Sequence, residues 1–275
     1  MKISLITACY NSAKTVKTAM ESVLSQKGVD IEYIVVDGGS NDGTVDIIKE
    51  FAARPVRPAS PSCPVIKWMS ERDRGMYDAI NKGIKMATGD IVGILNADDV
   101  LTSDDTLAHI ASAFNTDSCA LTPDPSRVDV VYADIRFVKE GESVEALREA
   151  PTVRYCSARR WRPWMFRFAA MVPHPSFYVR RECFERLGGY SLDYRICADF
   201  ELELRYLYLA KLKAAYLPEC VVVMRTGGMS TSGWRSNVVI NREDLRALRA
   251  HGIWSCMPLI YLKYLFKIWG FVFRG

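Results

Sequence analysis

Short apolar stretches alternate with amphipathic ones through the first hundred residues of this 275-residue chain. We expect the apolar stretches to be buried strands, and the amphipathic stretches between them to be helices. Short apolar strands joined by helices form a parallel sheet that is covered on both faces. The fold class is therefore α/β. The predicted strands are 3–8, 31–36, 65–69 and 91–95, and the predicted helices are 13–26, 44–51 and 76–87.

The rest of the chain continues with strands and helices in a less regular order. Strands are expected at 128–133, 176–179 and 215–224, with a hairpin running from the first of them to about residue 150. Helices are expected at 181–187, from Asp199 onward, and from about residue 236 onward. The length allows one or two domains. We predict one domain, 1–235, followed by a helical extension, 236–275.

Positive charge is concentrated in the second half of the chain. Hydrophobic residues make up 49% of the chain and charged ones 25%, which excludes a disordered or fibrous protein. The formal net charge of +4 is too small to indicate a nucleic-acid partner. The charge balance is nevertheless −7 over 1–150 and +11 over 151–275, and five arginines stand among aromatic residues in 154–168. The second half is therefore expected to meet phosphates or a membrane surface.

The cysteines and the N-terminus indicate the compartment. The eight cysteines are scattered and include no C-x-x-C pair, so we expect free thiols in a reducing cytoplasm and no zinc site. The first apolar stretch is too short for a signal peptide, and no run of 18 uncharged apolar residues predicts a transmembrane helix.

Polar, turn-forming segments follow each of the first four predicted strands. They are residues 10–11, 37–43, 71–75 and 96–99. In a parallel sheet the carboxyl ends of the strands share one edge, and ligands bind beyond that edge. These four segments are therefore expected to form one binding site.

Two features of that edge suggest its chemistry. Adjacent Asp98 and Asp99 would repel each other in a cleft unless a cation such as Mg²⁺ or Mn²⁺ lay between them and a phosphate. A helix cap is the alternative for this pair, although Asp104 and Asp105 suit that task better. Asp37 can accept hydrogen bonds from a base or a ribose, or it can belong to a plain turn. No G-x-G-x-x-G motif follows the first strand, which argues against an NAD site.

Together these motifs closely resemble the family 2 glycosyltransferases. The resemblance rests on residues 7–11 (TACYN), 35–44 (VVDGGSNDGT), 73–83 (DRGMYDAINKG) and 95–99 (LNADD), and continues more weakly at 174–177 (HPSF), 197–202 (CADFEL) and 227–230 (GGMS). It implies a GT-A fold, which is a Rossmann-like, mostly parallel sheet with helices on both faces. Residues 1–100 would then bind a nucleotide sugar and residues 101–235 the acceptor.

The resemblance also implies a reaction and its partners. The enzyme would transfer a hexose, with inversion, from a nucleotide-sugar donor to a hydroxyl group, using Mn²⁺ or Mg²⁺. A UDP-sugar is the expected donor. The most similar enzymes build bacterial O-antigen, capsule or exopolysaccharide, so a saccharide carried on polyprenyl diphosphate is the expected acceptor.

The same resemblance assigns roles to individual residues. Asp199 matches the catalytic base, although a helix N-terminal charge is its structural alternative. Asp98 and Asp99 match the metal-binding pair, but Asn96 replaces the first acid of an Asp-x-Asp motif, so the direct ligand stays open. His174 and Arg225 are candidates for contact with acceptor or diphosphate, and His174 can equally be a packed histidine. Residues expected to bind the nucleotide sugar are Thr7, Tyr10, Asn11, Asp37, Gly39, Ser40, Asp42, Asp73, Arg74, Tyr77, Asp78, Asn81, Asn96 and Asp98.

The C-terminal extension is expected to lie on a membrane. Residues 254–273 are strongly apolar and aromatic, with Lys263 and Lys267 four positions apart. Lysines near the middle favour an interfacial helix over a spanning one, whereas packing on the catalytic domain is the alternative. The protein is thus predicted to be peripheral on the cytoplasmic face of the inner membrane. Two rival functions are a metal-dependent nucleotidyltransferase and an inactive membrane-bound scaffold.

Overall fold

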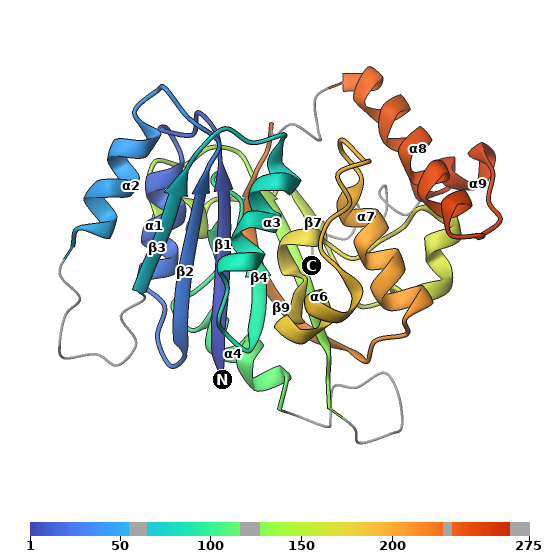
Figure 1. Cartoon of the computed structure of the whole chain (residues 1–275), viewed down its shortest axis with the longest axis horizontal. Helices are drawn as coiled ribbons and strands as arrows, with labels where there is room; N and C mark the ends of the chain where they lie inside the picture. The colour runs from blue at the N-terminus through green and yellow to red at the C-terminus, as the bar shows by residue number, and fades with distance from the viewer. Residues whose placement is uncertain (55–64, 116–126, 228–232, 265–275) are drawn as a thin grey trace.

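The computed structural model describes residues 1–54, 65–115, 127–227 and 233–264, and within them one mixed sheet runs through the molecule (Figure 1). The strand order is β3-β2-β1-β4-β8-β6-β9-β5, and β7 pairs with β6. Strands β1 to β4 are parallel to one another, whereas β8 runs antiparallel to both β4 and β6. The strands are β1 Lys2–Cys9, β2 Asp30–Asp37, β3 Val65–Ser70, β4 Ile91–Ile94, β5 Val100–Leu101, β6 Val130–Val138, β7 Arg154–Cys156, β8 Tyr178–Arg180 and β9 Ala214–Arg225.

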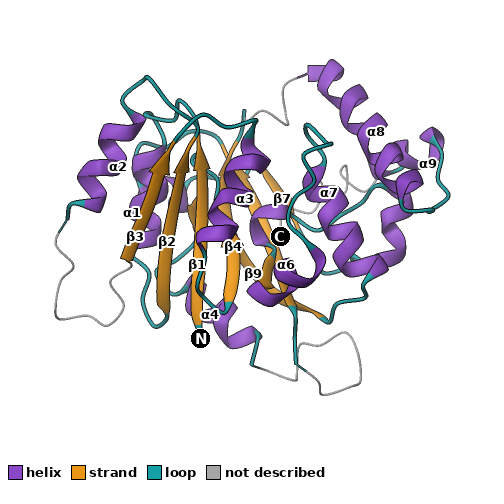
Figure 2. Ribbon diagram, in the orientation of Figure 1, coloured by secondary structure: helices purple, strands orange, loops and turns teal. Residues whose placement is uncertain are grey.

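Helices cover both faces of the sheet (Figure 2). One apolar core lies between the sheet and α1, α2 and α4, and a second lies between the sheet and α3, α6, α7 and α8. The helices are α1 Val16–Leu24, α2 Thr44–Ala52, α3 Met76–Met86, α4 Thr106–Ala113, α5 Val144–Glu149, α6 Arg181–Leu187, α7 Ala198–Glu203, α8 Gly233–Ala250 and α9 Met257–Tyr261. Short 3₁₀ segments span Pro163–Phe168 (η2) and His174–Ser176 (η3), and a π-helical segment, Leu204–Leu209 (η4), continues α7.

The predicted elements of the first hundred residues are confirmed, with boundaries that differ by a few residues at most. The hairpin expected after β6 is only partly correct. Strand β7 does return antiparallel to β6, but helix α5 is inserted between the two strands. Ser143 caps that helix by accepting a hydrogen bond from the backbone N–H of Ala146. Strand β5, only two residues long, was not predicted.

Helix α3 lies directly against β1, and this contact positions the loop that precedes α3. Gly83 of α3 sits so close to Ile6 of β1 that a Cβ atom there would be 2.5 Å from Ile6 Cγ2. Only glycine permits this approach, because any side chain would displace the helix from the sheet. Residues 71–77 therefore stay at the carboxyl edge of β1 to β3.

The start of the C-terminal extension belongs to the protein core. Leu248 of α8, Ile253 and Ile260 of α9 are buried in the same cluster as Phe200 of α7. Lys263 is only 5% exposed, and its Nζ donates a hydrogen bond to Asp244 Oδ2 at 2.6 Å. The prediction that Lys263 faces a membrane surface is therefore wrong, and Lys267 lies outside the described residues. Within the described ranges, no helix is long and apolar enough to cross a membrane.

Candidate active site

The loop after β2 is organised around the Asp37 carboxylate, which is completely buried. Its Oδ2 accepts hydrogen bonds from the backbone N–H groups of Gly39 and Ser40, both at 3.0 Å, and from Ser70 Oγ at 2.6 Å. Its Oδ1 accepts one from Ser40 Oγ. Burial raises the pKa of Asp37, but the hydrogen bonds from Ser40 and Ser70 outweigh it and hold that pKa below its usual range. In this conformation the Asp37 carboxylate shapes the loop by joining Gly39, Ser40 and Ser70.

Two further predicted residues join this loop to the one after β1. Asn11 adopts a left-handed conformation (φ 49°), and its backbone N–H donates to Ser40 Oγ at 2.7 Å. The Asp42 carboxylate accepts from the backbone N–H of Ala13 at 3.0 Å. Asn11 and Asp42 thus hold the two loops together.

Tyr10 presents the exposed surface of this edge, with 65% of its area accessible. Its ring lies beside Gly38, where a Cβ atom would be 3.4 Å from Tyr10 Cδ2. An exposed aromatic ring at the end of a parallel strand is available to stack on a planar base.

Thr7 has a different place from the one predicted. Its side chain is completely buried, donates to the Leu95 carbonyl at 2.9 Å and accepts from the Tyr33 hydroxyl at 3.0 Å. Both functions of the hydroxyl are used inside the sheet. The Thr7 hydroxyl therefore links β1 to β2 and to the residue that follows β4.

The block after β3 contains a buried carboxylate with one unsatisfied oxygen. Asp73 Oδ1 contacts Lys82 Nζ, whereas Asp73 Oδ2 is buried without a hydrogen-bond partner among the described residues. That oxygen faces the loop after β2, because a Cβ atom on Gly38 would lie 3.1 Å from it. Burial raises the pKa of Asp73, the neighbouring carboxylates Asp78 and Glu71 raise it further, and Lys82 opposes them. Asp73 is therefore ready to accept a hydrogen bond from a ligand at this edge.

Arg74 and Asp78 form the beginning of α3. The Arg74 backbone N–H donates to Asp78 Oδ2 at 3.0 Å, and this bond lowers the pKa of Asp78. The Arg74 guanidinium is 77% exposed and lies 3.7 Å from Asp78 Oδ1. It is thus an exposed positive charge at the rim of the edge.

The acidic pair after β4 combines one accessible and one buried carboxylate. Asp98 is partly exposed, whereas Asp99 is completely buried. Asp99 Oδ2 accepts from Asn96 Nδ2 at 2.7 Å, while Asp99 Oδ1 has no partner in the described part of the chain. Burial, and then the charge of Asp98, raise the pKa of Asp99 well above its usual value. The Arg225 side chain contacts the Asp98 carbonyl, which places a positive charge beside the pair.

Asp199 lies at the start of α7, as predicted, and helix α3 holds its carboxylate. Asp199 Oδ1 accepts from its neighbour's backbone N–H (Phe200, 2.8 Å) and from the Tyr77 hydroxyl at 3.1 Å. The Tyr77 hydroxyl also contacts the Ile196 carbonyl, and the Tyr77 ring stacks on Tyr190 with 5.5 Å between centroids. Tyr77 therefore connects the block after β3 to the carboxylate on α7.

Asn81 and His174 both form polar contacts with Tyr190. The Asn81 amide donates to the Tyr190 carbonyl at 2.8 Å and accepts from its backbone N–H at 2.9 Å, so Asn81 positions this loop. His174 Nε2 lies 2.8 Å from the Tyr190 hydroxyl. Burial lowers the pKa of His174, and the charge of Asp199 opposes this shift. Tyr190 itself was not predicted, since no motif surrounds it.

The other two acids of α7, Glu201 and Glu203, are both buried, although their positions in one helical turn predict that at least one of them points to solvent. Glu201 makes a bidentate ion pair with Arg205, with both N···O distances 3.0 Å, and its Oε1 is 2.9 Å from His251 Nε2. Glu203 accepts from the Val172 backbone N–H at 3.1 Å, and burial raises its pKa well above its usual value. Both carboxylates are thus buried and engaged, whereas Asp199 is partly exposed.

The fold and these loops define a nucleotide-dependent transferase of the GT-A type: a parallel sheet edge lined by carboxylates, and a separate carboxylate on the second half of the chain. The model of the family described as Glycosyl transferase family 2 matches residues 4–187. The chain belongs to this family and is a glycosyltransferase. Family membership excludes the nucleotidyltransferase alternative.

Relatives and solved structures agree with this assignment. The chain is 29% identical over 245 residues, 89% of its length and 83% of the relative's, to a PGL/p-HBAD biosynthesis glycosyltransferase of Mycobacterium tuberculosis. It shares a fold with the mannosyltransferase PcManGT of Pyrobaculum calidifontis, solved with GDP-Man and Mn²⁺ (TM-score 0.61, 21% identity, 98% of this chain and 72% of that one). It also shares a fold with residues 1–349 of S. aureus TarS, solved with UDP-GlcNAc (TM-score 0.62, 17% identity, 90% and 66%). The chain spans 44% of the longer TarS chain.

Proposed function

We propose that the protein is an inverting hexosyltransferase that moves a sugar from a UDP-sugar to a hydroxyl group of a saccharide carried on polyprenyl diphosphate. The observation that supports this most directly is the hydrogen bond between Tyr77 and Asp199. Asp199 is the one carboxylate of α7 that is partly exposed, and this bond connects it to α3, the helix that begins at the donor edge. An attack opposite the leaving group requires a base outside the acidic pair that faces the diphosphate, and Asp199 is such a carboxylate.

The acidic pair fits a divalent cation. Asp99 carries a buried oxygen without a partner and an Asp98 neighbour whose charge raises its pKa, and a cation relieves both costs. Among the described residues no three acidic, histidine or cysteine side chains gather as a metal site, so diphosphate oxygens would complete the ligand set. Asp98, the accessible member, and Asp99 would hold Mn²⁺ or Mg²⁺, which when bound neutralises charge on the departing diphosphate.

The other side chains are then assigned to binding and proton transfer. Tyr10 stacks on the base, the loop held by Asp37 lies along the nucleoside, and Asp73 Oδ2 accepts a hydrogen bond from the donor. Asp199 removes the proton of the acceptor hydroxyl while that oxygen bonds to the anomeric carbon. The bond from this carbon to the diphosphate oxygen breaks, and the nucleoside diphosphate leaves with the electron pair. One displacement inverts the anomeric centre.

The acceptor and the compartment rest on charge and surface chemistry. The second half of the chain carries a balance of +11, which favours a diphosphate-linked acceptor at an anionic surface. We place the protein peripherally on the cytoplasmic face of the inner membrane. The helical extension, 236–275, supplies the membrane contact in this proposal.

A screen of nucleotide sugars tests the function. Purified full-length protein is incubated with UDP-, GDP- and dTDP-hexoses, with Mn²⁺, Mg²⁺ or excess chelator, and the release of nucleoside diphosphate is measured. We expect metal-dependent hydrolysis of one UDP-hexose, and NMR of the first sugar released should show inversion. The variant Asp98→Asn should lose this activity, whereas the matched control Asp46→Asn, at an exposed position of α2, should keep it. Release that continues unchanged in chelator, or retention of configuration, would contradict the proposal.

A further inference from the structure

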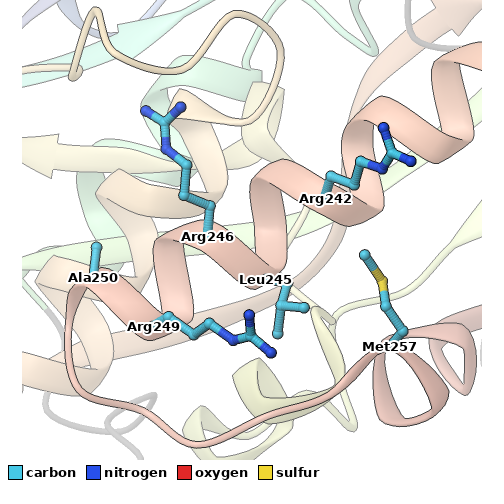
Figure 3. Close-up of a pocket in the computed structure, with 6 residues that line it drawn as sticks. All are labelled: Arg242, Leu245, Arg246, Arg249, Ala250 and Met257. Carbon is cyan, nitrogen blue, oxygen red and sulfur yellow. The ribbon is translucent and has the colours of Figure 1, made fainter.

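Away from the active site, a groove of about 540 Å³ lies between α8 and α9 (Figure 3). Three arginines of α8 stand along it at positions i, i+4 and i+7, which lie on one side of a helix. Between and opposite them are apolar side chains. The lining residues are Arg242, Leu245, Arg246, Arg249, Ala250 and Met257.

The positive charge of this groove is not neutralised by the acids of the same helix. Asp244 is buried and paired with Lys263. Glu243 is turned toward the loop before α7, where its carboxylate accepts from the backbone N–H groups of residues 195, 196 and 197 at 2.9 to 3.1 Å. The acids Glu243 and Asp244 of α8 are therefore turned inward, whereas Arg242, Arg246 and Arg249 are exposed.

The arginines differ in how firmly they are held. Arg246 donates to the Asp193 carbonyl at 2.7 Å and lies 4.5 Å from the centre of the Tyr194 ring. Arg242 and Arg249 are exposed and form no ion pair within the described residues. Figure 3 shows them on either side of Leu245, with Met257 of α9 opposite. Seven residues of helix separate their backbones by about 10 Å, so the groove offers two free cations around an apolar floor.

Exposed aromatic and apolar side chains follow the groove-lining residues closely in the sequence. Trp254, just after α8, is 72% exposed, and Tyr261 and Leu262 at the end of α9 are 51% and 38% exposed. Tryptophan and tyrosine beside arginine are typical of surfaces that rest at the level of lipid headgroups. A soluble anion would use the arginines but would leave this apolar surface in water.

We propose that the groove binds the phosphate headgroup of an anionic phospholipid, with Arg242 and Arg249 on the phosphate and Leu245 and Met257 against the glycerol and the first acyl carbons. This inference rests on the membrane-linked acceptor proposed above and assigns the surface that contacts the membrane. The neighbouring Trp254 and Tyr261 enter the headgroup layer.

Vesicle sedimentation tests the groove. Full-length protein is mixed with vesicles of phosphatidylcholine, with and without phosphatidylglycerol, and compared with the double variant Arg242→Gln/Arg249→Gln. We expect binding that requires phosphatidylglycerol, and a double variant that binds about 30-fold more weakly, since each arginine near an anionic surface contributes about 1 kcal/mol. The control, Lys17→Gln/Lys49→Gln, removes two exposed charges from α1 and α2, on the opposite side of the molecule (Figure 1). It should bind almost normally.

Three results would overturn the inference: no binding of wild-type protein to phosphatidylglycerol, an equal loss in both double variants, or release by inorganic phosphate at a concentration that leaves the ionic strength unchanged. The last result would assign the groove to a soluble anion. Trp254→Ser, which keeps all the arginines, should also weaken binding. Unchanged binding by this variant would show that Trp254 does not enter the headgroup layer. Hydrolysis of the donor reports on the active site independently of vesicle binding. Failure of the lipid-binding proposal can therefore be distinguished from failure of the proposed transferase function.

Discussion

Replacing Tyr77 by phenylalanine should slow sugar transfer without weakening donor binding. The Tyr77 hydroxyl is 3.1 Å from Asp199 Oδ1 and also contacts the Ile196 carbonyl, so it fixes the carboxylate relative to the loop before α7. A hydrogen bond to a charged group contributes about 1.5–3 kcal/mol. Because this hydroxyl is shared with a carbonyl, and the Phe200 N–H still holds Oδ1, we take the lower value. Transfer should then be about 10-fold slower.

The assay separates positioning from binding. The kcat for transfer to acceptor, the Kd for nucleoside diphosphate and the rate of donor hydrolysis by water are measured for each variant. Tyr190→Phe is the matched control, because it keeps a ring stacked on Tyr77 and removes a hydroxyl that contacts His174 instead of Asp199. Thermal unfolding shows whether the unpaired Ile196 carbonyl reduces stability. Wild-type kcat in Tyr77→Phe, or a weakened Kd, would refute the reasoning, because the residue would then be unneeded or a donor ligand.

Three other substitutions test the metal site, the catalytic base and a buried carboxylate that stabilises the fold. Asp98→Asn should abolish metal-dependent activity, and activity that persists in excess chelator would refute a metal role. Asp199→Asn should lower kcat for transfer by about 10²–10⁴ with unchanged nucleotide affinity in a calorimeter. Burial opposes ionisation of Glu32, but hydrogen bonds, led by that from Lys67, lower its pKa from 4.5 to about 2. Since the folded state holds this proton less tightly, the stabilisation is complete above about pH 5 and is lost as pH falls toward 2. Glu32→Gln should therefore cost about 3 kcal/mol in urea unfolding at pH 7 and much less at pH 3, and an equal cost at both would exclude this linkage.

The sequence predicts the donor half well because its signals are local. Apolar runs bounded by turn residues mark β1 to β4, and parallel pairing then brings the polar segments to one edge. Ser70 lies outside the motifs, but the same reasoning predicts its position. It is the last residue of β3, and the strand register pairs it with Asp37. Its hydroxyl donates to the Asp37 carboxylate.

Long-range partners explain what the sequence does not predict. Thr7 and Asn81 belong to the motifs, yet their polar groups are used by the Leu95 carbonyl and by the Tyr190 backbone, far away in the sequence. Glu201 is buried beside Arg205, four positions later on the same helical segment, and beside His251, just after α8. Helical periodicity predicts the first contact but not the second, which joins residues 50 positions apart.

The C-terminal extension shows the same limit for a whole segment. The sequence pattern of an amphipathic helix with a lysine is the same whether its apolar side faces lipid or protein, because both environments exclude water. The structure separates the two by what meets Lys263, a buried carboxylate at 2.6 Å. Breaking a buried ion pair costs about 3–5 kcal/mol, whereas lifting a lysine from a membrane surface costs about 1 kcal/mol. Residues 257–264 are therefore part of the folded domain, and any contact that Tyr261 and Leu262 make with lipid takes place while α9 stays packed against it.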